Sequence, residues 1–565
     1  MNNLKEIKTV FISVYYKDGL AQIVTKLHEL NISIISTGGT KDYIEKLNIP
    51  VTSAEDITGF PSILGGRVKT LHPNIFGGIL ARRNEATDIQ QVEEYKFSLI
   101  DLVIVDLYPF EETLKALSFG EGLGEVNLKS SKNPQGLTEP KLLQNLEISC
   151  DAAIIEKIDI GGISLIRAAA KNFNDVAIIS CKEQYSFLYD ILEKAHGKIS
   201  FADRKQLATE AFEVTSHYDT AIYKYFAKEN NDSFKISIKG SNSLRYGENP
   251  HQNGKFYGNL NEVFEQLHGK EISYNNLLDI DAAISLINEF NVITVAIIKH
   301  NNACGLASVN VNEMAGQARH DEVTPPSKRH VGSATRSTLI QTWKDALAGD
   351  PVSAFGGIVA TNTNVDKETA LEINKIFFEV IIAPSYSNEA LEILKQKKNR
   401  IILISKNILF NKKNFRTLLN GVIEQDKDLI TETISDLKVV TETKPTSNEI
   451  EDLLFANILV KHTKSNAIVL AKNKQLLASG AGQTSRVDAL KHAIEKAKYF
   501  GFDLNGAVMS SDAFFPFADS VEIAYNAGIK SVIQPGGSIR DNETINFCNE
   551  HKISMVFTGI RHFKH

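Results

Sequence analysis

Lys299 and His300 stand together at the end of an apolar run, Val295 to Ile298, and two asparagines follow them. Such a run predicts a buried strand that delivers polar side chains at its C-terminal end, where α/β proteins usually bind ligands. A neutral imidazole can take up a proton, and an ammonium beside it can stabilise developing negative charge. Neighbours on a regular strand point to opposite faces, so both groups can serve one site only if the chain turns there. The alternative is a strand-end histidine beside a solvated lysine.

Two stretches in the first half have the composition of anion-binding loops. The sequence Ser-Thr-Gly-Gly-Thr at 36–40 follows a β-branched run and precedes a helical pattern, so backbone amides, hydroxyls and a helix N-terminus could hold a phosphate. Arg67 and Lys69 would project to the same side of an extended segment. The alternatives are a plain strand–helix connection and a solvated surface strand.

Other polar groups follow predicted strands or open predicted helices. Tyr108 comes just after the apolar run 102–107, and the segment 158–162 leads into a helix that places Arg167 and Lys171 at i,i+4, where an anion between them would relieve their repulsion. In the second half, residues 479–486 open a helix with Arg486 adjacent, which is a further anion site. The phenylalanines between Ser510 and Asp519 fit either the wall of a heterocycle pocket or the core.

These groups need an α/β scaffold to bring them together. Residues 10–13, 32–35 and 102–107 are predicted strands, 20–30 and 201–227 predicted helices, and their alternation indicates a parallel sheet with crossover helices. A helix is expected to begin at Asp279 or Asp281. The polar run 228–233 is the candidate domain boundary, which gives domains 1–235 and 236–565. Residues 118–149 and 310–336 are expected to be inserted loops.

Composition narrows the class of protein. The 565 residues include 62 Lys and Arg against 68 Asp and Glu, a net charge of −6, so no general basic field for nucleic acid is present. Four cysteines are scattered without metal-ligand spacing, which fits a reducing compartment. The first residues lack the apolar core of a signal peptide, and no apolar run approaches the ~18 residues of a membrane span. We expect a cytoplasmic enzyme that contacts neither nucleic acid nor membrane.

The motifs occur in a characteristic order. Ser-Thr-Gly-Gly-Thr, Gly-Gly-Arg-Val-Lys-Thr-Leu-His-Pro, Leu-Tyr-Pro-Phe, Ile-Asp-Ile-Gly-Gly and Ala-Ala-Ala-Lys-Asn occupy the first half. Leu-Arg-Tyr-Gly-Glu-Asn-Pro-His-Gln, Lys-His, Asp-Pro-Val-Ser-Ala-Phe-Gly-Gly, Ser-Gly-Ala-Gly-Gln-Thr-Ser-Arg and Ser-Asp-Ala-Phe-Phe-Pro-Phe occupy the second. Over nearly its whole length the chain resembles the bifunctional AICAR formyltransferase/IMP cyclohydrolases of purine biosynthesis.

The resemblance implies two reactions. The C-terminal half would transfer a formyl group from 10-formyltetrahydrofolate to AICAR, and the N-terminal half would close formyl-AICAR to inosine monophosphate (IMP) with loss of water. It also implies a methylglyoxal-synthase-like domain followed by two cytidine-deaminase-like lobes, and a homodimer with shared formyltransferase sites. The zinc signature of true deaminases is absent, so no catalytic metal is expected. A structural monovalent cation is the one ion left open.

The resemblance also assigns site residues. His300 would be the base and Lys299 the charge stabiliser, while Lys171 would transfer the cyclohydrolase proton beside Tyr108 and Asp159. The cyclohydrolase nucleotide would contact Lys17, Ser36, Thr37, Gly38, Gly39, Thr40, Arg67, Lys69, Thr70 and Asp106. The AICAR ribotide would contact Arg245, Tyr246, Asn466 and Arg486, and the folate would contact Phe514, Asp519, Ser538 and Arg561.

Some residues depart from the family pattern. Tyr15 and Tyr16 stand where Ser-Asp is usual, and Asp106 stands where Asn is usual; an acid near a phosphorylated ligand costs binding unless it is paired or protonated. After His300, Asn301 and Ala303 replace Thr and Pro. One alternative is therefore a formyltransferase whose first half binds nucleotide but cyclises poorly. The other is a nucleotide-sensing regulator, against which the intact Lys299, His300 and Lys171 argue.

Overall fold

The computed structural model describes the chain except for residues 1–3, 65–67, 119–150, 228–231, 310–333 and 407–410. Arg67 and nearly all of the two expected insertions, 118–149 and 310–336, therefore lie outside the described residues. The rest forms two compact units, unit 1 from Met1 to Ile238 and unit 2 from Lys239 to His565. No helix within the described ranges is both long and apolar enough to cross a membrane.

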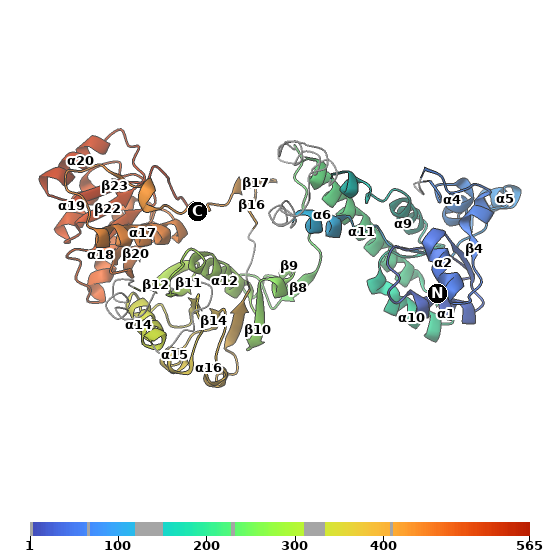
Figure 1. Ribbon diagram of the computed structural model, residues 1–565, viewed down its shortest axis with the longest axis horizontal. Coiled ribbons are helices and arrows are strands. Elements are labelled where there is room, and N and C mark those ends of the chain that lie inside the picture. Colours follow the sequence, from blue (N-terminus) through green and yellow to red (C-terminus); the bar gives the residue numbers. More distant parts are fainter. Residues whose placement is uncertain (1–3, 65–67, 119–150, 228–231, 310–333, 407–410) are drawn as a thin grey trace, which may run out of the picture. The chain divides into compact units, whose positions relative to one another are not determined.

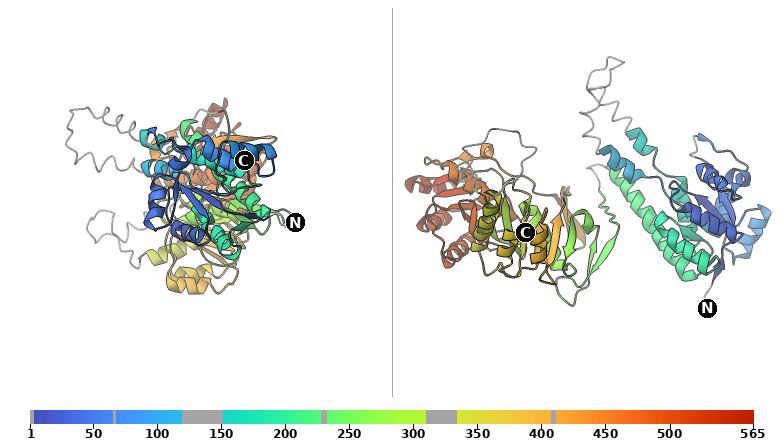
Figure 2. Two further views of the ribbon diagram at one scale, coloured as in Figure 1. Left: turned by 90° about the vertical axis from the view of Figure 1, so that its right-hand side faces the viewer. Right: turned by 60° about the horizontal axis from the view of Figure 1, so that its bottom comes forward.

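Unit 1, coloured blue to green in Figure 1, is built on a five-stranded sheet. Its strand order is β4-β3-β2-β5-β6, and every pair is parallel. The strands of this unit are β1 (Lys5–Glu6), β2 (Thr9–Ser13), β3 (Ser33–Ser36), β4 (Thr52–Ser53), β5 (Leu102–Val105), β6 (Ala177–Ile179) and β7 (Lys198–Ile199). Its helices are α1 (Leu20–Glu29), α2 (Gly38–Lys46), α3 (Ala54–Thr58), α4 (Pro73–Leu80), α5 (Ala86–Glu94), α6 (Phe110–Ser118), α9 (Gly161–Lys171), the short η3 (Lys182–Gln184), α10 (Tyr185–Lys194) and the 27-residue α11 (Phe201–Ala227), seen in Figure 2.

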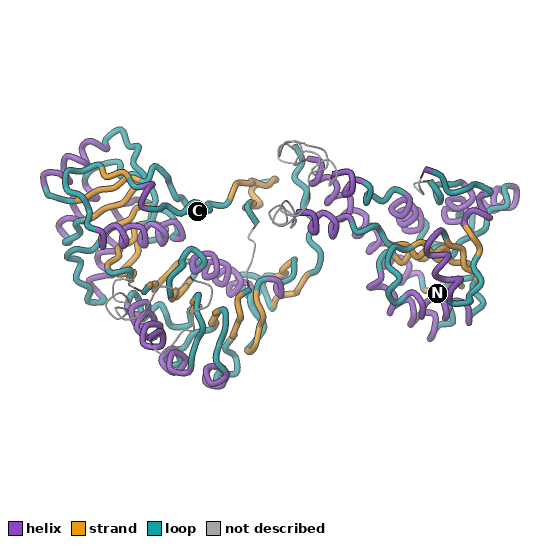
Figure 3. Tube along the Cα trace, in the orientation of Figure 1, coloured by secondary structure: helices purple, strands orange, loops and turns teal. Residues whose placement is uncertain are grey.

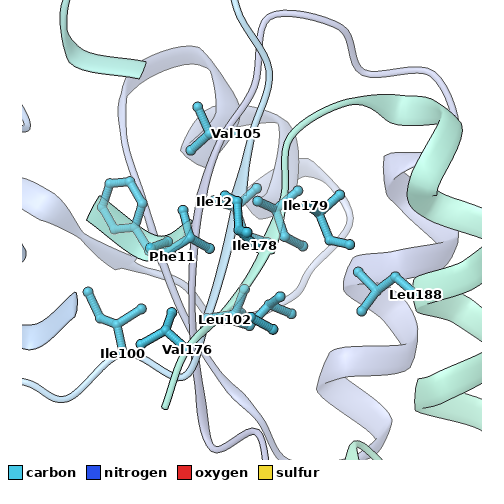
Figure 4. Packing of buried hydrophobic residues seen from close by; sticks show 14 of the residues in the cluster. Phe11, Ile12, Ile100, Leu102, Val105, Val176, Ile178, Ile179 and Leu188 are labelled. Carbon is cyan, nitrogen blue, oxygen red and sulfur yellow. The ribbon is translucent and has the colours of Figure 1, made fainter. Parts of the chain in front are cut away.

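The core of unit 1 follows from its strand sequences. Apolar side chains on both faces of β2, β5 and β6 are buried, as a parallel sheet covered by helices requires (Figure 4). Phe11, Leu102 and Ile178 come from three neighbouring strands, and Leu188 of α10 packs on the same cluster. Each such side chain contributes roughly 1.5–3 kcal/mol through its burial. The predicted parallel sheet and the helix over 201–227 are confirmed.

Unit 2 contains a mixed sheet of twelve strands, in the order β10-β15-β14-β13-β11-β12-β20-β19-β21-β22-β23-β18. Its strands are β8 (Ser241–Leu244), β9 (Gly254–Tyr257), β10 (Phe264–His268), β11 (Thr294–Lys299), β12 (Asn302–Ser308), β13 (Ile358–Thr361), β14 (Val380–Ala383), β15 (Ile401–Ser405), β16 (Lys413–Leu418), β17 (Gly421–Asp426), β18 (Lys438–Val439), β19 (Ile468–Lys472), β20 (Gln475–Gly480), β21 (Val508–Ser511), β22 (Ser531–Gln534) and β23 (Ser554–Phe557). Its helices are η4 (Leu260–Glu262), α12 (Tyr274–Ile287), α14 (Ala334–Ala348), α15 (Lys367–Ile373), α16 (Asn388–Leu394), η5 (Ile434–Asp436), α17 (Ser447–His462), α18 (Arg486–Tyr499), α19 (Asp519–Asn526) and α20 (Asp541–Glu550).

The order of elements in unit 2 occurs twice. β10-α12-β11-β12-α14-β13-α15-β14-α16-β15 is followed by β18-α17-β19-β20-α18-β21-α19-β22-α20-β23, and we call these the first and second lobes. The sheet order reads the same from either edge, and the lobes meet where β12 pairs with β20. Helices α12 and α17 cover one face of the sheet, while α14 to α16 and α18 to α20 cover the other (Figure 3).

Two local expectations are wrong. The predicted strand 102–107 ends at Val105, because Asp106 turns its carboxylate to backbone amides of another loop. The helix expected at Asp279 or Asp281 begins at Tyr274, where Ser273 and Asn276 form a reciprocal capping box. Asp279 therefore lies in the second turn of α12.

Candidate active sites

A cavity of 540 Å³ lies in unit 1, where the C-terminal ends of the sheet strands meet the first turns of α2 and α9. This is the edge at which open α/β sheets bind ligands. The predicted residues that line the cavity are Lys17, Thr37, Gly39, Thr40, Lys69, Thr70, Asp106, Tyr108 and Asp159. They come from segments far apart in sequence, and the fold brings them together.

Other predicted residues of unit 1 do not line this cavity. Ser36 is fully buried, and its hydroxyl donates to the Ile12 carbonyl at 2.8 Å, which makes it part of the sheet. Gly38 begins α2 with a φ of 43°, a left-handed conformation that favours glycine. Lys171 is the exposed last residue of α9, whereas the cavity takes the first residues of that helix. At about 1.5 Å per residue, the two ends of α9 are well separated.

Asp106 has partners that the sequence does not reveal. Its carboxylate accepts hydrogen bonds from the backbone amides of Tyr15 and Tyr16, the latter at 3.0 Å. Burial raises the pKa of Asp106, while these two bonds and the Lys17 ammonium oppose the rise. The acid therefore holds the loop between β2 and α1, and its charge is hydrogen-bonded.

Lys17 lies across the same loop. Its ammonium donates to the Thr40 hydroxyl at 3.1 Å and to the Val14 carbonyl. Burial lowers the pKa of Lys17; Asp106 opposes this shift and Lys69 adds to it. Lys17 and Lys69 thus bring cationic charge to the N-terminus of α2, where a phosphate would find backbone amides as well.

Asp159 and Tyr108 also line the cavity. The Asp159 carboxylate accepts from the Gly162 amide at 2.6 Å, and a Cβ at Gly162 would lie 2.7 Å from that carboxylate. Burial raises the pKa of Asp159 and of Tyr108, so the Tyr108 phenol stays protonated and can donate. The arrangement combines a hydrogen-bond donor, an acceptor and cations around one cavity.

Tyr15 is a lining residue that the site prediction missed. Its ring meets the Tyr108 ring edge to face, with centroids 5.6 Å apart and planes at 84°. The available signal was its departure from the family motif, since Tyr15 and Tyr16 stand where Ser-Asp is usual.

In unit 2 the chain makes the turn that Lys299 and His300 require. His300 and Asn301 form the connection between β11 and β12 with φ values of 51° and 62°, and the His300 side chain is exposed. Lys299 stays on the strand, and its ammonium donates to the Phe355 carbonyl at 2.9 Å. Asn302 links this turn to the second lobe, because its side chain donates to the His300 carbonyl at 2.9 Å and accepts from the Lys464 amide at 3.0 Å.

Asn466 and Arg486 lie together just beyond that link. The Arg486 guanidinium donates to the Asn466 side chain at 3.1 Å and to the Asp512 carboxylate at 2.9 Å. A second nitrogen of Arg486 donates to the Phe514 carbonyl at 3.3 Å. Two predicted ribotide residues and one predicted folate residue are therefore held in one cluster.

The remaining predicted residues of unit 2 lie on separate segments. Arg245 stacks on Tyr246 at 4.7 Å in the loop after β8, and Arg561 stacks on Phe563 at 4.4 Å near the C-terminus. Asp519 begins α19, and the Ser538 amide donates to Asp541 at 3.1 Å before α20. Within the described part of the chain, no group of three or more His, Cys, Asp or Glu side chains is arranged to hold a metal ion.

The fold and these groups define an enzyme of two α/β units, each with charged side chains gathered at strand ends. Residues 169–496 match the AICARFT/IMPCHase bienzyme family, and residues 19–122 match the MGS-like domain. The chain is 57% identical over 565 residues to a bifunctional purine biosynthesis protein PurH of Bacteroides thetaiotaomicron, covering 100% of both chains. Proteins of the same name from Aquifex aeolicus and Caldicellulosiruptor saccharolyticus are 46% and 43% identical, over 98% and 99% of this chain and 99% and 100% of theirs.

The chain belongs to the AICARFT/IMPCHase bienzyme family. It is a bifunctional AICAR formyltransferase and IMP cyclohydrolase, and it catalyses the final steps of de novo IMP synthesis. Its formyl donor is derived from folate.

Proposed function

We propose that the two reactions are divided between the units, with ring closure in the cavity of unit 1 and formyl transfer at the His300 turn of unit 2. The observation that carries this division is that each unit holds its own cluster of proton-transfer and cationic groups. The domain assignment is 1–235 for the cyclohydrolase and 236–565 for the formyltransferase.

For formyl transfer we assign the general base to His300. The AICAR amine attacks the formyl carbon of 10-formyltetrahydrofolate, His300 takes the amine proton, and the Lys299 ammonium stabilises the oxyanion that forms. Collapse of this intermediate releases tetrahydrofolate, whose nitrogen takes back a proton. His300 is exposed at the tip of the turn, so it can reach a substrate, and Lys299 would have to leave the Phe355 carbonyl or share its protons with it.

The binding roles are assigned to the groups around that turn. Arg245, Tyr246, Asn466 and Arg486 would hold the AICAR phosphate and ribose, and Phe514, Asp519, Ser538 and Arg561 would hold the folate. The Arg486 cluster supports this assignment, because it joins Asn466 to Phe514.

For ring closure we assign nucleotide binding to residues 37–40 and 69–70 with Lys17, and proton transfer to Tyr108 and Asp159. The carboxamide nitrogen attacks the formyl carbon and gives up one proton, the formamido nitrogen gives up a second, and the former formyl oxygen leaves with two protons as water. The protonated Tyr108 is suited to donate to that oxygen, and Lys69 to polarise it. Lys171 remains a predicted proton-transfer residue, and it can act only if it reaches the cavity from the far end of α9. The alternative is a unit 1 that binds nucleotide but cyclises poorly.

Four further assignments accompany this function. The repeated lobes of unit 2 support two cytidine-deaminase-like folds. We propose no catalytic zinc because the sequence lacks the deaminase zinc signature, and a structural monovalent cation stays open. A homodimer is supported by the β16–β17 hairpin, whose residues are all exposed and include Leu418 and Ile423. Light scattering on the purified protein tests the dimer, and a monomer at micromolar concentration contradicts it.

Cytoplasmic location is supported by the free thiols of Cys181, Cys304 and Cys548.

One assay tests the division of activities. AICAR and 10-formyltetrahydrofolate are added to the purified chain, and tetrahydrofolate and IMP are followed separately. His300→Ala should lower tetrahydrofolate release by about 10²–10⁴-fold, the range for a lost general base, and leave closure of added formyl-AICAR unchanged. A folded His300→Ala protein with full formyl transfer would remove His300 from the mechanism.

Gly39→Ala tests the cavity of unit 1. An added Cβ at Gly39 meets nothing within 4 Å, so the protein should fold as before. The methyl group would nevertheless stand where the phosphate approaches, so IMP binding and cyclisation should weaken while formyl transfer stays. Unchanged IMP affinity would place the phosphate elsewhere.

A further inference from the structure

The turn that carries His300 has a counterpart in the second lobe. There, Asn473 and Lys474 connect β19 to β20 with φ values of 54° and 56°, against 51° and 62° at His300 and Asn301. Both hairpins close on a matching pair, Lys299 with Asn302 and Lys472 with Gln475, and both have a bulge between the second and third pairs of the ladder. The two turns thus have the same left-handed conformation.

The lysines before the turns are bound alike. Lys299 donates to the Phe355 carbonyl at 2.9 Å, and Lys472 donates to the Asn505 carbonyl at 2.6 Å. Each carbonyl is followed by a left-handed glycine, Gly356 with φ 72° and Gly506 with φ 73°. The lysine contact is therefore a feature of the duplicated fold, present also in the second lobe, whose turn has no histidine.

Each turn is also held by an aspartate of the helix that precedes the hairpin. Asp279 of α12 accepts from the Asn301 amide at 2.6 Å. Asp452 of α17 accepts from the Asn473 amide at 2.8 Å and from the Lys474 amide at 2.7 Å. Both helices begin with a capping box, and both aspartates lie in the second turn. In each lobe, the carboxylate accepts hydrogen bonds from the backbone of the turn and so stabilises it.

The turns differ in chemistry. Asparagine and histidine both occur in left-handed backbone more often than most residues other than glycine, so the difference lies in the side chain that each turn presents, an imidazole at His300 and an amide at Asn473. A strained residue persists where its surroundings hold it, and such residues gather at functional sites. The His300 side chain is exposed, so the backbone conformation of the turn must be fixed by backbone hydrogen bonds. The Asn301 amide donates to Asp279, and the His300 carbonyl accepts from the Asn302 side chain.

We propose that Asp279 is a positioning residue for formyl transfer, which fixes the left-handed turn so that the His300 imidazole is presented to the substrate amine. The proposal rests on the proposed role of His300 as the base. Without the carboxylate, the Asn301 amide loses its acceptor, the turn is no longer fixed, and the imidazole moves. Displacement of a reacting group by about 1 Å can cost on the order of 10²-fold in rate.

The second lobe supplies a matched control, because Asp452 holds a turn without a proposed catalytic group. Asp279→Ala should lower kcat for formyl transfer by about 10- to 100-fold with little change in KM for AICAR, and closure of added formyl-AICAR should stay unchanged. Asp279→Asn should recover most of the rate, since its amide oxygen still accepts from Asn301. Asp452→Ala should lower the unfolding temperature but keep kcat.

The outcomes separate this proposal from the role of His300. If His300→Ala abolishes formyl transfer while folded Asp279→Ala keeps the wild-type kcat, the positioning role is overturned and the base stands. Full activity of His300→Ala removes the base itself. A rise in KM alone in Asp279→Ala, or an equal loss of kcat in Asp452→Ala, also overturns positioning. If Asp279→Ala is insoluble, Asp279→Glu keeps the charge but moves the carboxylate, and a normal kcat in that variant is equally decisive.

Discussion

The Arg486 guanidinium lies 2.9 Å from the carboxylate of Asp512, whose side chain is entirely buried. The other Asp512 oxygen accepts from the Ala467 amide at 3.1 Å, so the carboxylate also fixes the start of β19. The pair therefore couples a predicted substrate-binding arginine to the central strands of the second lobe.

Arg486→Ala should destabilise unit 2 as well as weaken AICAR binding. Removal of the guanidinium leaves a buried charge without its counterion, and breaking such a pair costs about 3–5 kcal/mol. Trp343 is the single tryptophan of the chain and is buried in unit 2, so its fluorescence can follow urea unfolding of that unit. The double variant Arg486→Ala, Asp512→Asn is the control and should recover part of the loss. An unchanged urea midpoint in Arg486→Ala would show that the pair contributes nothing to stability.

His562 should make the stability of unit 2 depend on alkaline pH. Its imidazole lies 2.6 Å from Asp428 and 2.8 Å from Glu432. Burial alone would lower the pKa of His562, but the bonds to these two acids outweigh it and raise the pKa to about 9. The folded state thus binds a proton that the unfolded chain releases near its usual pKa of about 6.5. The stabilisation is fully present below that pH and is lost as the pH rises through about 9.

The measurement is the free energy of unfolding of the wild type minus that of His562→Gln, across pH 6 to 10. The difference should shrink by on the order of 3 kcal/mol between about pH 6.5 and about pH 9, the interval between the two pKa values. His462 is the contrast, because burial lowers its pKa and its contribution is lost instead as the pH falls. A flat difference for His562→Gln would mean that the imidazole is not charged in the folded state.

The variant Asp106→Asn tests two roles for this carboxylate. It could repel the phosphorylated nucleotide, or it could stabilise the loop between β2 and α1 through its hydrogen bonds. A bare acid would repel IMP, so its removal would tighten binding, most clearly at low salt. Because the Asp106 oxygens accept from two backbone amides, an Asn leaves one amide without an acceptor, at a cost of about 1–3 kcal/mol. We therefore expect weaker IMP binding and a slower ring closure at every salt concentration, measured by calorimetry and by IMP formation. Tighter binding at low salt would restore the repulsion hypothesis.

The same residue shows how far sequence reasoning reaches. Local features follow from the amino-acid sequence. These are the glycine loop, the start of α2 and the apolar strands. The partners of Asp106 are amides of a different strand end, and the acceptor for the His300 turn is Asp279 on α12, so both depend on the tertiary fold. The motif order predicts a role for Lys171 in the cyclohydrolase site. Lys171 ends α9 and is not among the residues that line the cavity, so this role stays a prediction.

The duplication in unit 2 was implied by the family resemblance, but the strand patterns did not show it, for a related reason. Short strands of four to seven residues give weak local signals, and the sheet order depends on pairings between distant segments, such as β12 with β20. The need for a turn after Lys299 could be deduced from strand alternation, but its left-handed form could not. Residues alone supply the chemistry of each site, and the non-local contacts determine which groups meet.

The two activities should separate when the chain is divided between Ile238 and Lys239. The linker itself suggested an end near Ser233, but Ser237 bonds to His217 at 2.7 Å and Lys235 lies over the Tyr223 ring at 4.2 Å, so residues up to 238 support α11. A fragment 1–238 should cyclise formyl-AICAR and release no tetrahydrofolate, and a fragment 239–565 should do the reverse. The shorter fragment 1–233 is the matched control and should unfold more easily, by about 1 kcal/mol for the lost hydrogen bond. Formyl transfer by a soluble 1–238 fragment, or cyclisation by 239–565, would show that the reactions are assigned to the wrong units.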